Sequence, residues 1–284
     1  MTILTQTKAR PGWWAILKNF WAEIDRDHVS IMAAGVAFYT LLSIFPGMSA
    51  LISIYGLVAD PMTIENQLNS LAGILPQEAL TLLSDQLHAL VAAPRDKLGL
   101  GLVVSLLLAL WSASSGTGAL MQALTVAYEE RDNRGTLSFY GRAIALTLGI
   151  GLFALVSLFL IAVIPAVIAY LPISELWRDR VSLIRWPVLA VLVLFALGVL
   201  YRYAPARQNP CWHCLSAGTI GAALLWLVGS AGFSFYVARF SSYDKTYGSL
   251  GAVVILLVWF YVTAYIVLAG AELNSEIEKA RARG

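Results

Sequence analysis

Long apolar segments alternate with shorter polar ones along this chain, and the first of them, Ile31 to Ala59, contains no acidic or basic side chain. Because about 20 apolar residues in a helix cross the roughly 30 Å hydrocarbon core of a bilayer, this segment can span a membrane. Five more apolar segments follow it. The pattern therefore predicts an all-α membrane protein with six transmembrane helices, at about 31–59, 98–128, 143–170, 186–203, 215–238 and 248–271.

The amphipathic segments between and before these spans are predicted to lie at the membrane surface. Residues 13–26 repeat apolar side chains every three or four positions, which indicates a helix with one apolar face. Its tryptophans are typical of an interfacial helix, although a helix packed on the end of the bundle has the same pattern. Residues 61–94 contain two leucine stripes bounded by prolines, which predict a small amphipathic cap on the extracytoplasmic side. We interpret residues 1–284 as a single integral membrane domain.

The first span has a proline near its middle and a face of small and polar residues. Pro46 lacks a backbone N–H, so we expect a kink or break there, with the freed carbonyls facing Ser or Thr of other helices. Small residues let transmembrane helices approach closely, and on this ground Gly116, Gly218 and Gly251 are predicted at helix contacts. A polar seam for a substrate is predicted where two spans meet, with the candidates Tyr39, Ser43, Pro46, Gly47, Ser112, Ser115 and Gly116.

Composition agrees with a membrane protein and narrows the choice of partners. The chain is 59% hydrophobic and 13% charged, whereas soluble proteins average about 45–50% and 25%. A net charge of +2 predicts no nucleic-acid partner. The two cysteines, Cys211 and Cys214, are neither a disulfide framework nor a complete zinc site. Because no short apolar core with a cleavage site begins the chain, we expect no removable signal peptide.

Several strings of residues together resemble the YihY/BrkB family of bacterial inner-membrane proteins. They are AAGVAFYTLLSIFPG, LWSASSGTGALMQAL and YGSLGAVVILLVWFYVTAYIVLAGAELN, and the similarity runs from about Phe20 to Glu278. The resemblance implies six helices in the cytoplasmic membrane and a loose link to virulence and to envelope lipid export; some members have a ribonuclease BN label. Thr125 departs from the pattern, which has Asn near this position, so a polar role there is open. The family strings also single out an inner-end motif of Tyr247, Gly248, Glu272 and Asn274.

The ribonuclease label is not favoured by the residues themselves. Metal-assisted phosphodiester hydrolysis requires carboxylates or histidines clustered around a cation. The chain has three histidines, His28, His88 and His213, on different segments and in no metal-binding motif. We therefore expect no catalytic residue, no metal and no cofactor, and interpret the protein as a non-enzyme.

A basic cluster at the outer end of the third and fourth spans is a candidate head-group site. Arg178, Arg180 and Arg185 lie between Trp177 and Trp186. They are either interfacial anchors or a binding site for anionic lipid, since Arg pairs with phosphate through two hydrogen bonds. Glu272, at the inner end of the sixth span, is either a helix cap or ion-pair partner, or part of a functional motif.

The leading functional hypothesis is transport or handling of a lipid or another envelope amphiphile. The interiors of the spans contain no ionisable acid or base, which argues against ion-coupled transport of a charged solute. The alternative is a non-catalytic membrane scaffold or envelope-assembly factor, and an enzyme comes third. The expected partners are membrane lipids, and envelope proteins or a second copy of the chain are possible ones.

Positive charge predicts the orientation. The segments on the side of both termini carry twelve Lys and Arg residues and the opposite segments carry seven, which favours cytoplasmic termini in the inner membrane. Single cysteines in a Cys-free background should react with an impermeant reagent in intact cells at Asp85, Asp179 and Asp244. Cysteines at Arg134 and Arg207 should stay unlabelled, and their labelling would overturn the six-span model.

Overall fold

The computed structural model describes residues 12–58, 98–160, 175–207, 216–240 and 249–282. Every regular element in these ranges is a helix, so the all-α prediction is confirmed for them. The helices are α1 (Trp13–Arg26), α2 (Val29–Val58), α5 (Leu98–Ala113), α6 (Ser115–Ala127), α7 (Thr136–Leu158), α9 (Glu175–Tyr203), α10 (Ala217–Phe240) and α12 (Ser249–Ala282). The predicted cap, 61–94, lies outside the described residues.

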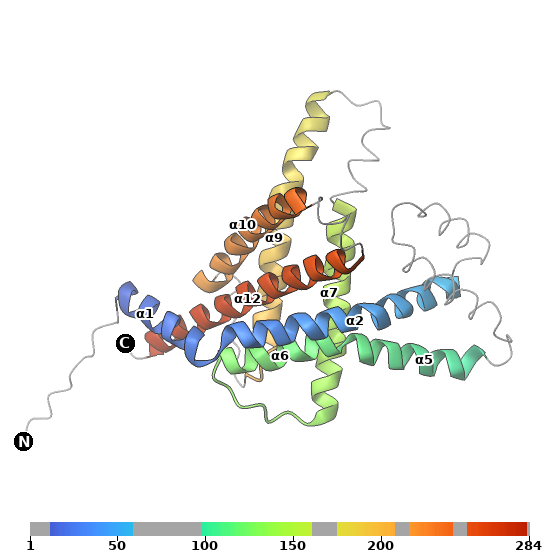
Figure 1. Ribbon diagram of the computed structural model, residues 1–284, viewed down its shortest axis with the longest axis horizontal. Helices are drawn as coiled ribbons and strands as arrows, with labels where there is room; N and C mark the ends of the chain where they lie inside the picture. Colours follow the sequence, from blue (N-terminus) through green and yellow to red (C-terminus); the bar gives the residue numbers. More distant parts are fainter. Residues whose placement is uncertain (1–11, 59–97, 161–174, 208–215, 241–248, 283–284) are drawn as a thin grey trace, which may run out of the picture.

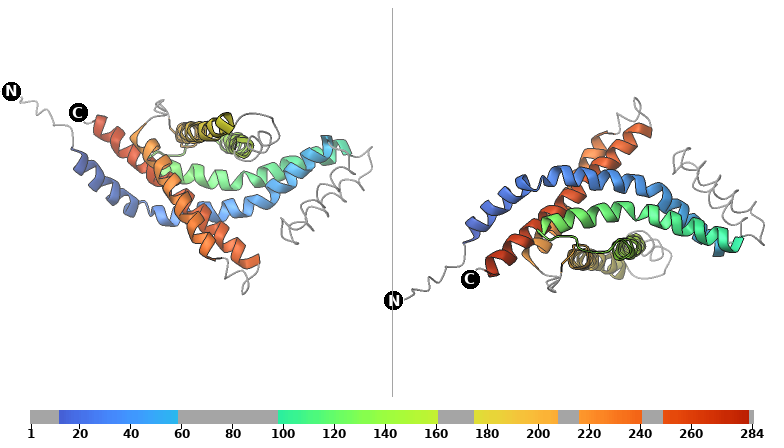
Figure 2. Two further views of the ribbon diagram at one scale, coloured as in Figure 1. Left: turned by 90° about the horizontal axis from the view of Figure 1, so that it is seen from above. Right: turned by 90° about the horizontal axis from the view of Figure 1, so that it is seen from below.

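Three groups of helices fan out from one end of the molecule (Figures 1 and 2). One group is α2 with α5 and α6, the second is α10 with α12, and the third is α7 with α9. Helix α12 packs against both α2 and α10, whereas α7 and α9 run steeply across the others in Figure 1. We call the shared end the joined end; it contains α1, the start of α2 and α10, and the ends of α6, α9 and α12.

The hydrophobic core lies at the joined end. Its large side chains include Met121 and Leu124 of α6 and Leu268 of α12, all fully buried. Alanines fill the space between them, among them Ala33 of α2 and Ala271 of α12. Because these side chains are short, the helix backbones approach closely here.

The two central spans differ from their prediction in the position of the break. We expected a kink or a break at Pro46. Helix α2 is continuous through this residue and bends as a gradual curve, so no break is found there (Figure 2). The second span is the one that is interrupted, at Ser114 between α5 and α6, where the Ser114 hydroxyl donates to the Trp111 carbonyl at 2.6 Å. A Cβ at Gly47 would lie 3.7 Å from Ala113, so the interruption faces the curved part of α2.

Helix lengths support membrane crossing for part of the chain. The helices over 136–157 and 253–282 are each long and apolar enough to cross a membrane, and a third results if 13–26 and 29–44, bent by 57°, count as one span. Shorter apolar segments lie within two other helices: Pro187–Tyr203 in α9, and Ala217–Phe233 in α10, which itself continues to Phe240. Helix α9 begins at Glu175, so it is 29 residues long and extends well before the span expected at 186–203. The six spans remain a prediction.

Glycines mark two of the three predicted helix contacts. A Cβ at Gly116 would lie 2.7 Å from the Thr40 Cα, and one at Gly218 would collide with Asn274 and the Gly270 carbonyl. At Gly251 no described atom lies within 4 Å of the position of a Cβ, so the described residues show no helix contact there. Gly270 was not anticipated; its Cβ would lie 2.6 Å from Ala222.

Alanine substitutions should separate these positions by stability. Gly116→Ala and Gly218→Ala should each lower the free energy of unfolding by about 1–3 kcal/mol, because the new methyl group overpacks a helix contact. Gly251→Ala is the matched control and should be neutral or slightly stabilising. Thermal unfolding in detergent measures the difference, and equal melting temperatures for all three variants would contradict the packing described here.

Candidate functional site

The predicted polar seam is a close helix contact at its centre. Ser43 and Gly116 meet there, since a Cβ at Gly116 would lie 3.1 Å from the Ser43 hydroxyl oxygen, and Gly47 faces Ala113. The half-buried Pro46 belongs to the same stretch of α2. The other three candidates, Tyr39, Ser112 and Ser115, are exposed and do not join the contact. The two helices are in close contact at the centre of the seam, and its role as a substrate route stays a prediction.

Other predicted residues cannot be placed in a site. Arg178, Arg180 and Arg185 belong to α9, but their side chains lie outside the described part of the chain, and the head-group site stays a prediction. The motif residues Tyr247 and Gly248 also lie outside the described residues, as do both cysteines.

The other two motif residues, Glu272 and Asn274, are both buried on α12 at the joined end. The Asn274 Oδ1 accepts a hydrogen bond from the Gly218 N–H at 3.0 Å. Its Nδ2 donates to the hydroxyls of Tyr128 and Thr219, at 3.4 Å each. One amide therefore connects α12 to the end of α6 and to the start of α10.

Thr125 connects α6 to the chain that follows α9. Its hydroxyl group donates to the Met121 carbonyl at 2.7 Å, and the oxygen of the same group accepts from the Ala206 N–H at 3.2 Å. Arg134 donates to the same oxygen at 3.4 Å and to the Ala204 carbonyl at 2.9 Å. The position therefore has a polar role even though it departs from the family pattern.

Four segments were predicted to share one side of the membrane. Ion pairs hold these four segments together at the joined end. Arg207 pairs with Glu278, and Lys279 binds Glu129 at 2.9 Å. The hydrogen bond from Lys279 holds the pKa of Glu129 below its usual value. Glu129 also pairs with Arg26, so charges from the N-terminal segment, the 129–142 connection, the 202–214 connection and the C-terminus meet.

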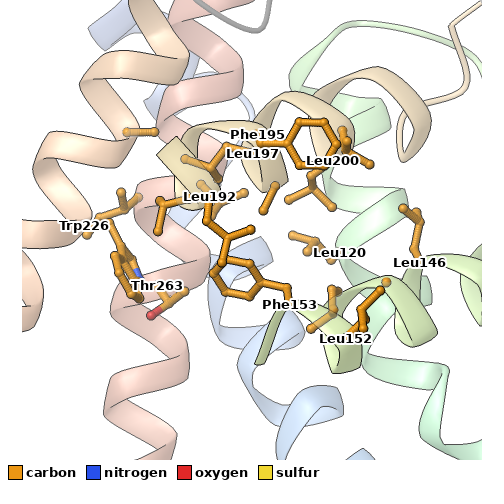
Figure 3. A pocket seen from close by; sticks show the side chains of 18 of the residues that line it. Leu120, Leu146, Leu152, Phe153, Leu192, Phe195, Leu197, Leu200, Trp226 and Thr263 are labelled. Atoms are coloured by element: carbon orange, nitrogen blue, oxygen red, sulfur yellow. The ribbon is translucent and has the colours of Figure 1, made fainter. Parts of the chain in front are cut away.

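An apolar pocket of about 450 Å³ lies where the three groups of helices begin to separate (Figure 3). Helix α7 contributes Phe153, α9 contributes Leu192, and α10 and α12 contribute Trp226 and Thr263. Among the described residues that line it, only Trp226 and Thr263 have polar side-chain atoms. Sequence reasoning missed this pocket because apolar side chains that line a gap look the same in a sequence as those that face lipid.

A metal centre has no support in the ranges described by the structure. No three or more His, Cys, Asp or Glu side chains in those ranges are arranged so that they could hold a metal ion. At the joined end, hydrogen bonds and ion pairs hold the helices together, and we call this network the lock. The pocket has room for a ligand.

Comparison with known proteins gives a consistent result over nearly the whole chain. A family model described as virulence factor BrkB matches residues 20–284. A ribonuclease-like protein, YfkH, from Bacillus subtilis is 27% identical over 94% of this chain and 96% of its own. The membrane protein YihY of Escherichia coli O7:K1 is 29% identical over 94% of this chain and 90% of its own.

A membrane protein of Cronobacter sakazakii is similar to the same degree, 28% identical over 92% of this chain and 87% of its own. No solved structure matches the chain.

The Thr125 hydroxyl gives a direct test of the lock. Thr125→Val keeps the shape but leaves the Ala206 N–H without its acceptor, so it should lower the free energy of unfolding by about 1–3 kcal/mol. Thr125→Ser keeps the hydroxyl and should cost clearly less. Equilibrium unfolding in mixed micelles compares the two, and equal losses would show that the lost interaction is not the hydrogen bond.

Proposed function

The chain belongs to the virulence factor BrkB family and is an integral membrane protein, and from this premise we propose that it binds a membrane lipid and handles or transports it. The acyl chain occupies the apolar pocket between α7, α9, α10 and α12. We further propose that it does so in the bacterial inner membrane, with both termini in the cytoplasm, and that no catalytic step is involved.

The size and chemistry of the pocket support this proposal. Its volume of about 450 Å³ falls in the range of roughly 300–1,000 Å³ that is typical of ligand sites. Well-packed protein interiors have few voids larger than a water molecule, so a gap of this size inside a membrane is filled by something from its surroundings. Because the lining is apolar, hydrocarbon fits it and a polar solute does not.

The exposure of its lining supports entry from the bilayer. Ile150 and Leu152 of α7 and Phe195 of α9 line the pocket and are 46%, 63% and 55% exposed, so the pocket is open to its surroundings. The pocket is therefore continuous with the apolar surface that faces lipid. An acyl chain can enter sideways between the helix groups without passing through water.

The arginines of α9 are proposed to bind the head group of the same lipid. Arg185 precedes the pocket residue Leu192 by seven positions, which is about 10 Å along a helix at 1.5 Å per residue. A phosphate held there gains about 1.5–3 kcal/mol for each charged hydrogen bond. The ligand class is accordingly an anionic lipid or a lipid-linked precursor, with its hydrocarbon in the pocket.

A pair of substitutions on α7 tests the proposal. Gly149 lines the pocket and Gly151 does not, and neither has an atom within 4 Å of the position of a Cβ. Gly149→Phe should fill the pocket without overpacking the fold, whereas Gly151→Phe adds the same side chain outside it. In nanodiscs that contain phosphatidylglycerol with a photoactivatable acyl chain, Gly149→Phe should reduce crosslinking to pocket residues at least several-fold, and Gly151→Phe should leave it unchanged.

The readout is crosslink yield at pocket peptides, quantified by mass spectrometry, together with the melting temperature of each variant. Equal crosslinking of Gly149→Phe and the parent, at equal stability, would refute the pocket as the lipid site. The scaffold hypothesis would then take precedence.

A further inference from the structure

One buried carboxyl group and two partly buried ones lie at the joined end and have no role in the lipid pocket. Glu272 of α12 is 1% exposed. Glu23 of α1 and Asp27, which follows α1, have side chains that are 14% and 13% exposed. One oxygen of each, Glu272 Oε1, Glu23 Oε2 and Asp27 Oδ2, is shielded from solvent and has no hydrogen-bond partner.

The three groups lie close enough to influence one another. The negative charges of Asp27 and Glu23 both act on Glu272, and both disfavour its ionised form. Arg26 Nη2 comes within 2.5 Å of Glu23 Oε2, but not in hydrogen-bonding geometry, and Arg26 is itself 61% exposed. Burial raises the pKa of Glu23 above its ordinary value despite this neighbour.

The cations around the group are already shared with other acids. Lys279 of α12 binds Glu276 at 2.7 Å and Glu129, which follows α6, at 2.9 Å. Arg26 divides its contacts among Glu23, Asp27 and Glu129.

The other helices packed against α12 present neutral groups near this level. Tyr201 of α9 donates its hydroxyl to the Val267 carbonyl, and Tyr128, after α6, binds Asn274. On α2, Ser30 binds the Tyr261 hydroxyl at 2.8 Å. The buried acids therefore outnumber the two cations in contact with them.

A buried carboxylate without a partner, next to other carboxylates, is strongly disfavoured, and the usual remedy is to bind a proton. A proton on Glu272 removes its charge, and a neutral carboxyl group is tolerated far better at a buried position. No group of three or more His, Cys, Asp or Glu side chains in the described ranges could hold a metal ion there instead.

We propose that Glu272, which is buried where α12 packs against α1 and lies beside the carboxylates of Glu23 and Asp27, is a proton-binding site. The proton comes from solvent at the joined end and returns to it, and no covalent step is involved. The site is independent of lipid binding in the pocket.

Loss of the proton should weaken the contact between α1 and α12. In this pH range the folded protein holds a proton on the site, whereas the unfolded chain has already released it. The stability of the folded protein must therefore fall as the pH rises through the range in which the site releases its proton. Ordinary carboxylates are already ionised between about pH 6 and pH 9, so they add no slope there.

The experiment measures unfolding of the full-length protein in detergent between about pH 6 and pH 9. The parent's unfolding constant should increase with pH by up to tenfold per pH unit for one bound proton. Glu272→Gln mimics the protonated form and should remove most of this dependence. Glu278→Gln is the matched control, since Glu278 lies on the same helix but pairs with Arg207 outside the cluster; it should keep the dependence of the parent.

Infrared spectroscopy gives a second measurement that a merely structural role would not change. The parent should show the carbonyl stretch of a protonated carboxylic acid in this pH range, and Glu272→Gln should diminish it. If Glu272→Gln does not fold, Asp27→Asn carries the test: it removes a negative charge beside Glu272, so the pH dependence should move to lower pH. A pH-independent parent without the infrared band, or a stability that follows added Na⁺ or Mg²⁺ and not pH, would overturn the proposal.

Discussion

Close backbone approach between α12 and its two neighbours is the constraint on which the rest of the structure depends. Gly270 of α12 lies against Ala222 of α10, and Gly218 lies against Asn274, so that no larger side chain fits at either point. The buried amide of Asn274 then hydrogen-bonds across the same contact. Small residues set the distance and the amide sets the register, so α12 is held in one position relative to α10 and α6.

Because the helices are tied together at one end only, they separate toward the other. The core is confined to the joined end, and the described part of α7 packs little beyond it. A gap between the helix groups is a direct consequence of this arrangement, and the apolar pocket lies where that gap begins. The same arrangement concentrates charge at the joined end, where ion pairs from distant parts of the chain meet.

Local features of the chain could be predicted from the sequence better than the contacts between them. The amphipathic pattern of 13–26 predicts α1 with its observed limits, because helix periodicity is a property of neighbouring residues. Its apolar stripe divides in the fold: Ile16 and Ile24 are buried, whereas Trp21 is 61% exposed. Periodicity identifies an apolar face but does not say whether protein or lipid covers it.

The candidate sites show the same limit. The spacing of polar residues along α2 places Tyr39 in the predicted seam. In the structure Tyr39 is exposed, and the contact of α2 with α6 passes through Thr40, one position away. Thr125 and Ala206, which hydrogen-bond, are too far apart in sequence for any local pattern to pair them. Pro46 removes one donor, and α2 tolerates this by curving, while the interruption falls at a serine in the facing helix.

The length of α12 has a consequence for where the joined end lies. The helix has 34 residues, Ser249–Ala282, and at 1.5 Å per residue it reaches about 51 Å. The hydrocarbon core of an average bilayer is only about 30 Å thick, so a helix of this length that crosses it also projects beyond it. The last turns of α12 contain Glu276, Glu278 and Lys279, which are ion-paired at the joined end. Charged side chains are costly in hydrocarbon, so these turns stand in the aqueous layer beside the membrane.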